Sequence, residues 1–383
     1  MKFIHLADCH LGSWNIPELN QLNFESFQYV IDTSIKEKVD FVLIAGDLFD
    51  SAYPSIDILK SAFNEFRKLR EEDIPVFIIA GSHDYSVSGK TFLEVLEKSG
   101  FCKDVSKYEE KNGKIILFPT ICKGAAIYGF PGKKSSLEVN DLERIKLQDS
   151  PGMFKILMLH TAIKDAVPEL AEIKAIDPKK LPNFDYLALG HLHINYAKDN
   201  IVYSGPTFPN SLSEIEELKY GSFYLFNNGK FQRKEIKLKE VYVLNLEIKN
   251  TANTTENIIS FLEDENLENK IVIIKLFGIL ENGKITDIDL KKIESVVKKK
   301  RAFAFLRNTS KLFLPDMEMK ISSIDEKDIE ESIIKDFEKK NKSKFNEVIF
   351  PLMRSLQAEK LEDERISIFE DRILSEINKI LKI

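Results

Sequence analysis

Histidine is scarce in this chain, which has six in 383 residues, and the positions of these histidines indicate its chemistry. Five of them stand at or just after the ends of apolar runs: His10, His83, His160, His191 and His193. Asp8 precedes the first of these, and Asp47 follows an apolar run. Imidazole and carboxylate groups without a thiolate cluster suit manganese, iron, zinc or nickel.

More potential ligands are present than one tetrahedral zinc ion takes. The set suits two ions about 3.5–4 Å apart that share a bridging carboxylate. Such a pair hydrolyses phosphate esters, because it activates water and neutralises charge on the phosphorus. The sequence therefore predicts phosphoryl chemistry, provided that the fold brings these residues together.

The spacing of apolar residues predicts an α/β arrangement for the first 85 residues. Short buried strands are predicted at 2–7, 41–46 and 74–81, with helices over about 20–37 and 55–70 between them. Alternating strands and helices predict parallel strands covered by helices. Later apolar runs, at 154–160 and 185–191 among others, add strands, so we expect two sheets packed face to face with helices outside.

The candidate ligands follow the ends of five predicted strands, and the carboxyl ends of strands form the ligand crevice of α/β sheets. Each group also has a purely structural explanation. Asp8 and Asp47 could be turn residues or helix caps, residues 81–84 a Gly-Ser turn, and His160 a core histidine. Together, these explanations require five independent coincidences at one sheet edge. Cys9 lies between two candidate ligands, so we expect it to face the other way and pack in the core.

Composition fits a globular protein of two or three domains, with 43% hydrophobic and 30% charged residues. No apolar run is long enough for a membrane span, and the first residues do not resemble a signal peptide. Three scattered cysteines predict no disulfide framework, so a cytoplasmic protein is expected. The net charge of −6 does not exclude a nucleic-acid substrate, since a local basic face beside bound cations suffices.

Three domains are predicted from changes of pattern along the chain: 1–240 with the strands and candidate ligands, 241–315 as a small α+β domain, and 322–383 as a helical segment. The last segment carries an apolar stripe at Ile366, Phe369, Ile373, Ile377 and Ile380. The run from Lys298 to Arg301 is either a phosphate-contacting patch or a solvated helix end whose cations favour the helix dipole.

The series DxH, GDxxD, GxHD, H and GHxH, in this order and spacing, resembles the calcineurin-like metallophosphoesterases. The opening HLADCHLG and the closing GHLH with IVYSGP are most similar to the SbcD-type nucleases of double-strand-break repair, also known as the meiotic-recombination nuclease family. These motifs cover about residues 1–210. The resemblance implies a two-sheet β-sandwich core flanked by helices as a nuclease domain over 1–240, with a small α+β capping domain that binds DNA over 241–315 and a C-terminal helical segment over 322–383.

Carried over position by position, the resemblance implies two manganese ions, with magnesium or another divalent ion as an alternative. One ion would be held by Asp8, His10 and His193. The other would be held by His160 and His191, and Asp47 would bridge the two ions.

The resemblance also implies that His83 takes the position of the family's catalytic histidine, from which it could protonate the leaving oxygen. Two residues depart from the family's pattern. Ser82 stands where an asparagine carbonyl ordinarily ligates the second metal, and a hydroxyl is a shorter and poorer donor. Asp50 stands where relatives often carry a histidine, which could alter which end of the DNA is cut.

The function implied is a Mn-dependent DNA nuclease, an exonuclease on duplex ends and an endonuclease on single strands, within a double-strand-break repair complex. The C-terminal helices would dock an SbcC-type coiled-coil ABC ATPase. A homodimer would form through helices that carry Leu59 and, further along the chain, Phe92, Leu93 and Leu96. Two alternatives are a phosphodiesterase acting on small nucleotides and a scaffold of the same fold with weakened catalysis.

Overall fold

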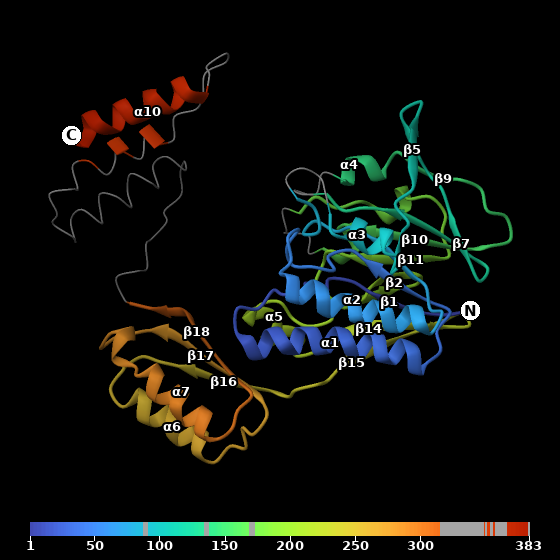
Figure 1. Cartoon of the computed structure of the whole chain (residues 1–383). Coiled ribbons are helices and arrows are strands. Elements are labelled where there is room, and N and C mark those ends of the chain that lie inside the picture. Colours follow the sequence, from blue (N-terminus) through green and yellow to red (C-terminus); the bar gives the residue numbers. More distant parts are fainter. Residues whose placement is uncertain are drawn as a thin grey trace. The chain divides into compact units, whose positions relative to one another are not determined.

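The computed structural model describes residues 1–86, 91–133, 138–167, 173–314, 348, 351–352, 355–356 and 366–381. Within these ranges the chain has a mixed α/β architecture with two six-stranded sheets and two three-stranded sheets (Figure 1). The predicted fold class, a two-sheet core with flanking helices, is confirmed.

The first six-stranded sheet contains the parallel strands that were predicted near the N-terminus. Its order is β15 (Lys230–Ile236), β14 (Gly221–Asn227), β1 (Lys2–Leu6), β2 (Phe41–Ala45), β3 (Val76–Ile79) and β4 (Lys103–Asp104). From β1 to β4 neighbouring strands are parallel, whereas β14 is antiparallel to β1. The carboxyl ends of β1, β2 and β3 therefore share one edge.

The second six-stranded sheet contains the two later apolar runs side by side. Its order is β12 (Tyr196–Lys198), β13 (Ile201–Tyr203), β11 (Tyr186–Gly190), β10 (Phe154–His160), β8 (Ala125–Phe130) and β7 (Thr120–Cys122). The two sheets pack on each other through a buried cluster that includes Phe3 and Phe41 from the first and Ile156 and Met158 from the second. A small outlying sheet consists of β5 (Tyr108–Lys111), β6 (Lys114–Leu117) and β9 (Ile145–Leu147).

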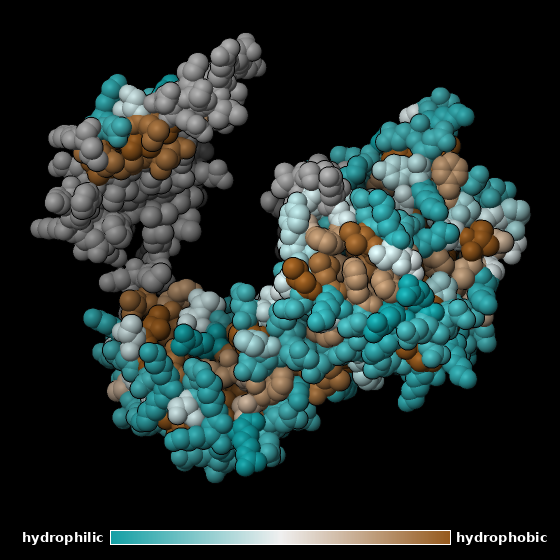
Figure 2. All heavy atoms as spheres, viewed as in Figure 1, coloured by the Kyte–Doolittle hydropathy of each residue, from teal (hydrophilic) through white to brown (hydrophobic). Residues whose placement is uncertain are grey.

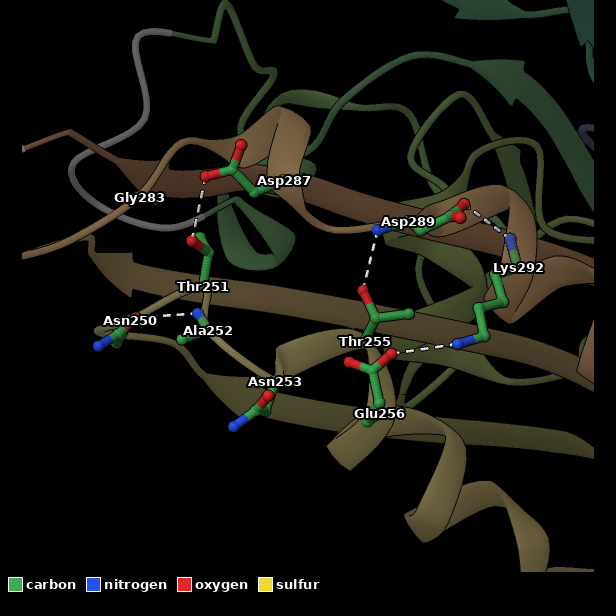
Figure 3. Close-up of a pocket in the computed structure, with 10 residues that line it drawn as sticks. All are labelled: Asn250, Thr251, Ala252, Asn253, Thr255, Glu256, Gly283, Asp287, Asp289 and Lys292. Carbon is green, nitrogen blue, oxygen red and sulfur yellow. Dashed lines mark hydrogen bonds and ion pairs between the residues drawn. The ribbon is translucent and has the colours of Figure 1, made fainter.

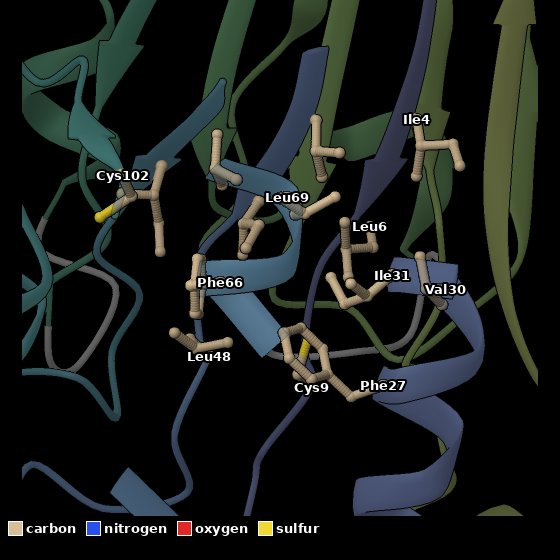
Figure 4. Packing of buried hydrophobic residues seen from close by; sticks show 14 of the residues in the cluster. Ile4, Leu6, Cys9, Phe27, Val30, Ile31, Leu48, Phe66, Leu69 and Cys102 are labelled. Carbon is tan, nitrogen blue, oxygen red and sulfur yellow. The ribbon is translucent and has the colours of Figure 1, made fainter. Parts of the chain in front are cut away.

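Helices α1 (Pro17–Lys36), α2 (Ile56–Glu71) and α3 (Leu93–Lys98) cover the outer face of the first sheet (Figure 1). Helix α1 begins three residues before the predicted start, because Pro17 is suited to the first turn of a helix. The shared core includes Cys9, which packs near Phe27 as expected from its position (Figure 4).

Two of the residues predicted for a dimer contact on these helices are not exposed. Leu93 and Leu96 are buried in the core, so they are not available for a dimer contact. Tyr53 and Ile56, at the start of α2, are instead 70% and 81% exposed. Figure 2 shows hydrophobic residues on the surface in this part of the molecule.

A third sheet begins at residue 241, where the pattern of the sequence changes. It consists of the parallel strands β16 (Val241–Glu247), β17 (Ile271–Ile279) and β18 (Ala304–Phe313). Helices α6 (Thr254–Glu263) and α7 (Leu290–Lys299) pack on one face of this sheet (Figure 1). The other face contacts α1 and α5 (Leu212–Leu218) through a second apolar cluster. We call these three strands the capping sheet and residues 241–313 as a whole the capping domain.

The remaining short helices are α4 (Val139–Leu142), η2 (Lys164–Ala166), η3 (Pro178–Lys180) and η4 (Ile285–Asp287). The contacts divide the chain into two compact units, Met1–Phe313 and Leu314–Ile383. In the second unit, α10 (Ile366–Leu381) is the one long helix among the described residues, and hydrophobic residues gather on it (Figure 2). Most of the predicted segment 322–383 lies outside the described residues. None of the helices in the described ranges has the length and apolar character needed to cross a membrane.

Candidate metal centre

Five strands deliver the candidate ligands to one place. Strands β1, β2 and β3 of the first sheet end two or three residues before Asp8, Asp47 and Ser82. Strand β10 ends with His160, and its neighbour β11 ends just before His191. Because the two sheets are stacked with these ends together, residues more than 180 positions apart come into contact, as Asp8 and His191 do. This convergence is the arrangement that the sequence predicted.

The backbone around these residues is held in an uncommon conformation. Asp8, His10, Asp47 and His191 all have positive φ angles, of 52°, 42°, 50° and 92°. Residues with side chains pay a conformational cost there, and such strain concentrates at functional sites. The surrounding hydrogen bonds hold the loops in place: Asp8 N donates to Gly46 O at 3.1 Å, and His10 N donates to Asp47 O at 3.0 Å.

One group of donors consists of Asp8, His10 and His193, whose ligand atoms lie within 4.8 Å of one another. The Nε2 atoms of His10 and His193 are 3.2 Å apart. Their Nδ1 atoms face carboxylates on the other side, Asp50 for His10 at 3.2 Å and Glu214 for His193 at 3.1 Å. A carboxylate partner favours the proton on Nδ1, which leaves each Nε2 free to act as a ligand.

A second group consists of Asp8, Asp47 and His160, also within 4.8 Å. Asp47 Oδ2 is 3.1 Å from His160 Nε2 and 3.6 Å from His10 Nε2, so this carboxylate lies between the two groups. His160 Nδ1 donates to Ala45 O at 2.9 Å, which fixes the ring with Nε2 toward Asp47.

The other predicted residues border these groups. The ring of His191 lies against that of His160, with centroids 5.2 Å apart, and His191 N donates to Asp8 Oδ1 at 2.9 Å. Ser82 Oγ is 3.4 Å from Asp47 Oδ2. His83 stands at the open side of the site: its side chain is 49% exposed, and its ring contacts that of His10 edge to face.

The charges of the buried groups are strongly coupled. Burial raises the pKa of Asp8. Burial acts to lower the pKa of His160, but Asp47 and Asp8 outweigh it and raise that pKa to about 10. Burial, followed by the charge of His160, lowers the pKa of His191 to about 4. The pKa of Asp47 stays well below its usual range despite burial, because His160 and His10 stabilise the carboxylate. Such opposed shifts cluster at functional sites.

These residues fit a pair of divalent cations. Asp8 Oδ2 is buried without a hydrogen-bond partner among the described residues, which is a cost unless an ion or a water satisfies it. Two imidazole nitrogens facing each other at 3.2 Å repel unless a proton or a cation lies between them. The donors are nitrogen and carboxylate oxygen, with no thiolate, as in sites for manganese, iron or zinc.

Two residues of the site were not found from the sequence. Asp84 is buried and accepts hydrogen bonds from Gly81 N at 2.9 Å and Phe49 N at 3.3 Å, so it ties two ligand-bearing loops together. Burial, followed by the charge of Asp47, raises its pKa to about 6. Glu214 gave no catalytic signal, because the SxxE pattern of residues 211–214 indicates only the start of a helix.

The glycines at the strand ends are required by the packing of this site. A Cβ on Gly46 would collide with the His160 ring, and a Cβ on Gly81 would collide with the Asp47 carboxylate. Gly46 also has a φ of +91°, which favours glycine. These residues were open to interpretation as ordinary turn glycines from the sequence alone.

Residues 1–195 match the family model of the calcineurin-like phosphoesterases. The chain belongs to this family, which confirms the predicted resemblance and the prediction of a metal-dependent phosphoesterase. The family's divalent ions agree with the donor groups described above.

Within the family, the chain is similar to archaeal proteins named DNA double-strand break repair protein Mre11. The protein of Methanocaldococcus jannaschii is 30% identical over 290 residues, which cover 71% of this chain and 75% of that protein. The protein of Methanococcus maripaludis is 29% identical over 297 residues, covering 72% and 77%. The protein of Archaeoglobus fulgidus is 26% identical, and its match covers 98% of this chain and 85% of that protein.

The basic run at the end of α7 makes contacts within its own domain. Lys298 pairs with Glu294 at 2.6 Å, and Arg301 pairs with Glu268 at 3.4 Å. Lys300 donates to the backbone oxygens of Glu263 and Glu265 at the end of α6. Lys298 and Arg301 remain 71% and 82% exposed, so these surface contacts are weak and both interpretations of the run stay open.

A polar pocket lies at the start of α6, away from the candidate metal centre (Figure 3). Its charged groups are engaged with neighbours: Asp287 accepts from Thr251 Oγ1 at 3.3 Å, and Lys292 pairs with Glu256 at 3.1 Å. Each charged side chain that lines this pocket thus has a partner within the described residues, so the pocket does not point to a charged ligand.

Proposed function

We propose that this chain is a Mn-dependent DNA nuclease that hydrolyses phosphodiesters with two metal ions, in a double-strand-break repair complex. The observation that carries this proposal is the convergence of carboxylates and imidazoles from five strand ends at one edge of two stacked sheets. The names of the archaeal relatives support DNA repair as the setting. Exonuclease action on duplex ends and endonuclease action on single strands are part of this proposal.

In this proposal Asp8, His10 and His193 hold one ion, and His160 and His191 hold the other. Asp47 bridges them from its position between His10 and His160. Ser82 offers a weak oxygen donor to the second ion. When bound, a pair of divalent ions activates water for attack and neutralises the charge that develops on the phosphate.

His83 is proposed as the general acid. Its Nδ1 lies 2.8 Å from the backbone oxygen of Asp50, which only accepts, so Nδ1 carries a proton. Nε2 is then the atom that gains and releases a proton. Because the side chain is half exposed at the open side of the site, Nε2 can protonate the oxygen of a leaving nucleotide.

We also propose a role for each domain in the cleavage of DNA. Residues 1–240 form the nuclease domain, and 241–315 cap it and contact DNA. A small-nucleotide phosphodiesterase has no need of such a cap, which favours a polymer substrate. The chain is proposed to dimerise through the helices that carry Leu59 and Phe92, which are both partly buried, together with the exposed Tyr53 and Ile56 near the start of α2.

The C-terminal segment is proposed to dock an SbcC-type coiled-coil ABC ATPase. Helix α10 has Ile373, Ile377 and Ile380 at helical spacing, and all three are partly buried. An apolar stripe with this spacing suits a partner helix or groove.

The function is tested by incubating end-labelled linear duplex and circular single-stranded DNA with the full chain and Mn²⁺. We expect cleavage of both, no cleavage with a chelator, and loss of cleavage in Asp8→Asn. Hydrolysis of small nucleotide esters without any cleavage of DNA would instead support the alternative phosphodiesterase. Metal binding without any hydrolysis would support a catalytically weakened scaffold.

A further inference from the structure

Helix α5 lies between the candidate metal centre and the capping sheet. It begins after Ser211, whose hydroxyl accepts a hydrogen bond from Glu214 N at 3.2 Å. Its residue 214 contacts the metal centre, and residues 215 and 216 contact the capping sheet. Consecutive side chains of this helix therefore link the metal centre to the capping sheet.

Glu214 faces the metal centre. Its Oε1 lies 3.1 Å from His193 Nδ1, and its Oε2 accepts from Asn210 N at 2.9 Å. The hydrogen bond from Asn210 N holds the carboxylate in place. The contact with Nδ1 therefore fixes the rotation of the His193 ring and favours the proton on Nδ1. Partners of this kind orient histidine ligands and raise their basicity.

The next two residues face the capping sheet. Ile215 is fully buried in a cluster with Ile271 and Ile273 of β17. Glu216 Oε2 lies 2.6 Å from Lys275 Nζ, also on β17, and Glu216 Oε1 lies 3.5 Å from Asn308 Nδ2 on β18. An apolar contact and a partly buried ion pair thus fix α5 to two strands of the capping sheet.

We propose that Glu214 is a positioning residue for His193 and that α5 couples the placement of the capping sheet to the first metal. A shift of β17 moves α5 through Ile215 and Glu216, and the helix carries Glu214 with it. His193 then loses the partner that orients it, and the first ion is held less tightly. A change at the capping domain, such as the arrival of DNA, thereby alters metal affinity, and bound metal in turn favours one placement of the cap. This inference rests on the proposed metal-dependent function.

The first test is a calorimetric Mn²⁺ titration of the full chain and two Glu214 variants. Glu214→Ala is expected to weaken the first site about 10- to 100-fold, the usual effect of losing such a partner. The second site, which depends on His160 and His191, should change little. Glu214→Gln keeps an oxygen that can accept from His193 Nδ1, so it should bind closer to the wild type. A general loss of folding would weaken both sites and would not be rescued by Gln.

The second test addresses the link to the cap. Lys275→Met removes the ion pair to Glu216 and is expected to weaken the first site about two- to tenfold. Lys292→Met is the matched control, because it removes a capping-domain ion pair, to Glu256, that does not touch α5. In a Glu214→Ala background, Lys275→Met should have no further effect on the first site.

The outcomes separate this inference from the proposed function. Failure of the wild type to bind Mn²⁺ removes the proposed function and the coupling with it. Normal binding that Glu214→Ala leaves unchanged overturns only the positioning role and the coupling. Two results would overturn the coupling through α5. One is that Lys275→Met weakens the first site equally in the wild-type and Glu214→Ala backgrounds. The other is that Lys292→Met weakens the first site as much as Lys275→Met does.

Discussion

The Nδ1 atom of His83 lies 2.8 Å from the backbone oxygen of Asp50, in the loop that follows β2. This contact fixes a proton on Nδ1, because a backbone oxygen only accepts, and leaves Nε2 as the ring nitrogen without this partner. The ring is held by the backbone of the loop, and its Nδ1 also lies 3.9 Å from Asp50 Oδ1.

His83→Ser is expected to reduce DNA cleavage about 10²- to 10⁴-fold, the usual contribution of a general acid. Mn²⁺ binding and DNA binding should persist, because the side chain is not among the proposed ligands. Calorimetry and a cleavage assay on the same preparation measure both. Loss of Mn²⁺ from the variant would mean that His83 is a ligand and that another group is the acid.

Ser82→Asn is expected to lower the Mn²⁺ concentration that gives half-maximal cleavage. Ser82 Oγ lies 3.4 Å from Asp47 Oδ2, and an asparagine would place a carbonyl oxygen further out toward the second site. A carbonyl is also a better neutral donor than a hydroxyl. Ser82→Ala is the matched control and should not lower this Mn²⁺ concentration. An unchanged Mn²⁺ dependence in Ser82→Asn would show that this position does not limit the second site.

His5 should make the fold sensitive to acid. It is buried in the core, its Nδ1 is 3.0 Å from Tyr186 Oη, and burial lowers its pKa to about 3. Since the unfolded chain binds this proton near pH 6.5, the unfolded state binds more protons between these values. The stabilising contribution is complete above pH 6.5 and is lost as the pH falls.

Urea denaturation at pH 6 and pH 5 measures this effect. The free energy of unfolding of the wild type should fall by about 1.4 kcal/mol more per pH unit than that of His5→Gln, which does not titrate. Equal slopes for the two proteins would show that His5 is protonated in the folded state.

Ile56→Asp is expected to split the proposed homodimer without unfolding its halves. Ile56 is 81% exposed, so a charge there costs the monomer little, whereas burial of that charge in a dimer contact is unfavourable. Light scattering at micromolar concentration measures the change. Ile121→Asp, at a residue 52% exposed on β7, is the control and should leave the dimer intact. A monomeric wild type would remove the dimer proposal.

Charges on α10 test the proposed ATPase contact. Ile373→Asp and Ile377→Asp place a charge within the partly buried stripe and should abolish co-purification with the SbcC-type ATPase. Leu374 is 57% exposed on the same helix, so Leu374→Asp is the control and should retain the partner. Cleavage of DNA by the isolated variants should match the wild type. Retention of the ATPase by both stripe variants would contradict the docking role.

The buried strands of the core and the candidate ligands at their ends could be predicted, because local patterns of the sequence indicate both. A short apolar run predicts a buried strand, and the motif at the end of that run identifies Asp47 or His160 as a candidate ligand. Glu214 could not be predicted as a partner of His193, because this contact depends on where helix α5 packs in the folded protein. Likewise, the apolar side chains of Leu93 and Leu96 look alike in the sequence whether they face the core or the solvent. Only the orientation of α3 shows that both are buried.

The pairing of β1 with β14 has a consequence for synthesis on the ribosome. Asp8 and His10 are made more than 200 residues before β14, yet β1 takes its antiparallel neighbour from residues 221–227. Until those residues leave the exit tunnel, one edge of β1 lacks its partner, and unpaired edges invite aggregation. The nascent chain therefore has a long interval in which this edge is open to wrong pairing and metal cannot be held by the full set of donors, because His160, His191 and His193 also follow later in the chain.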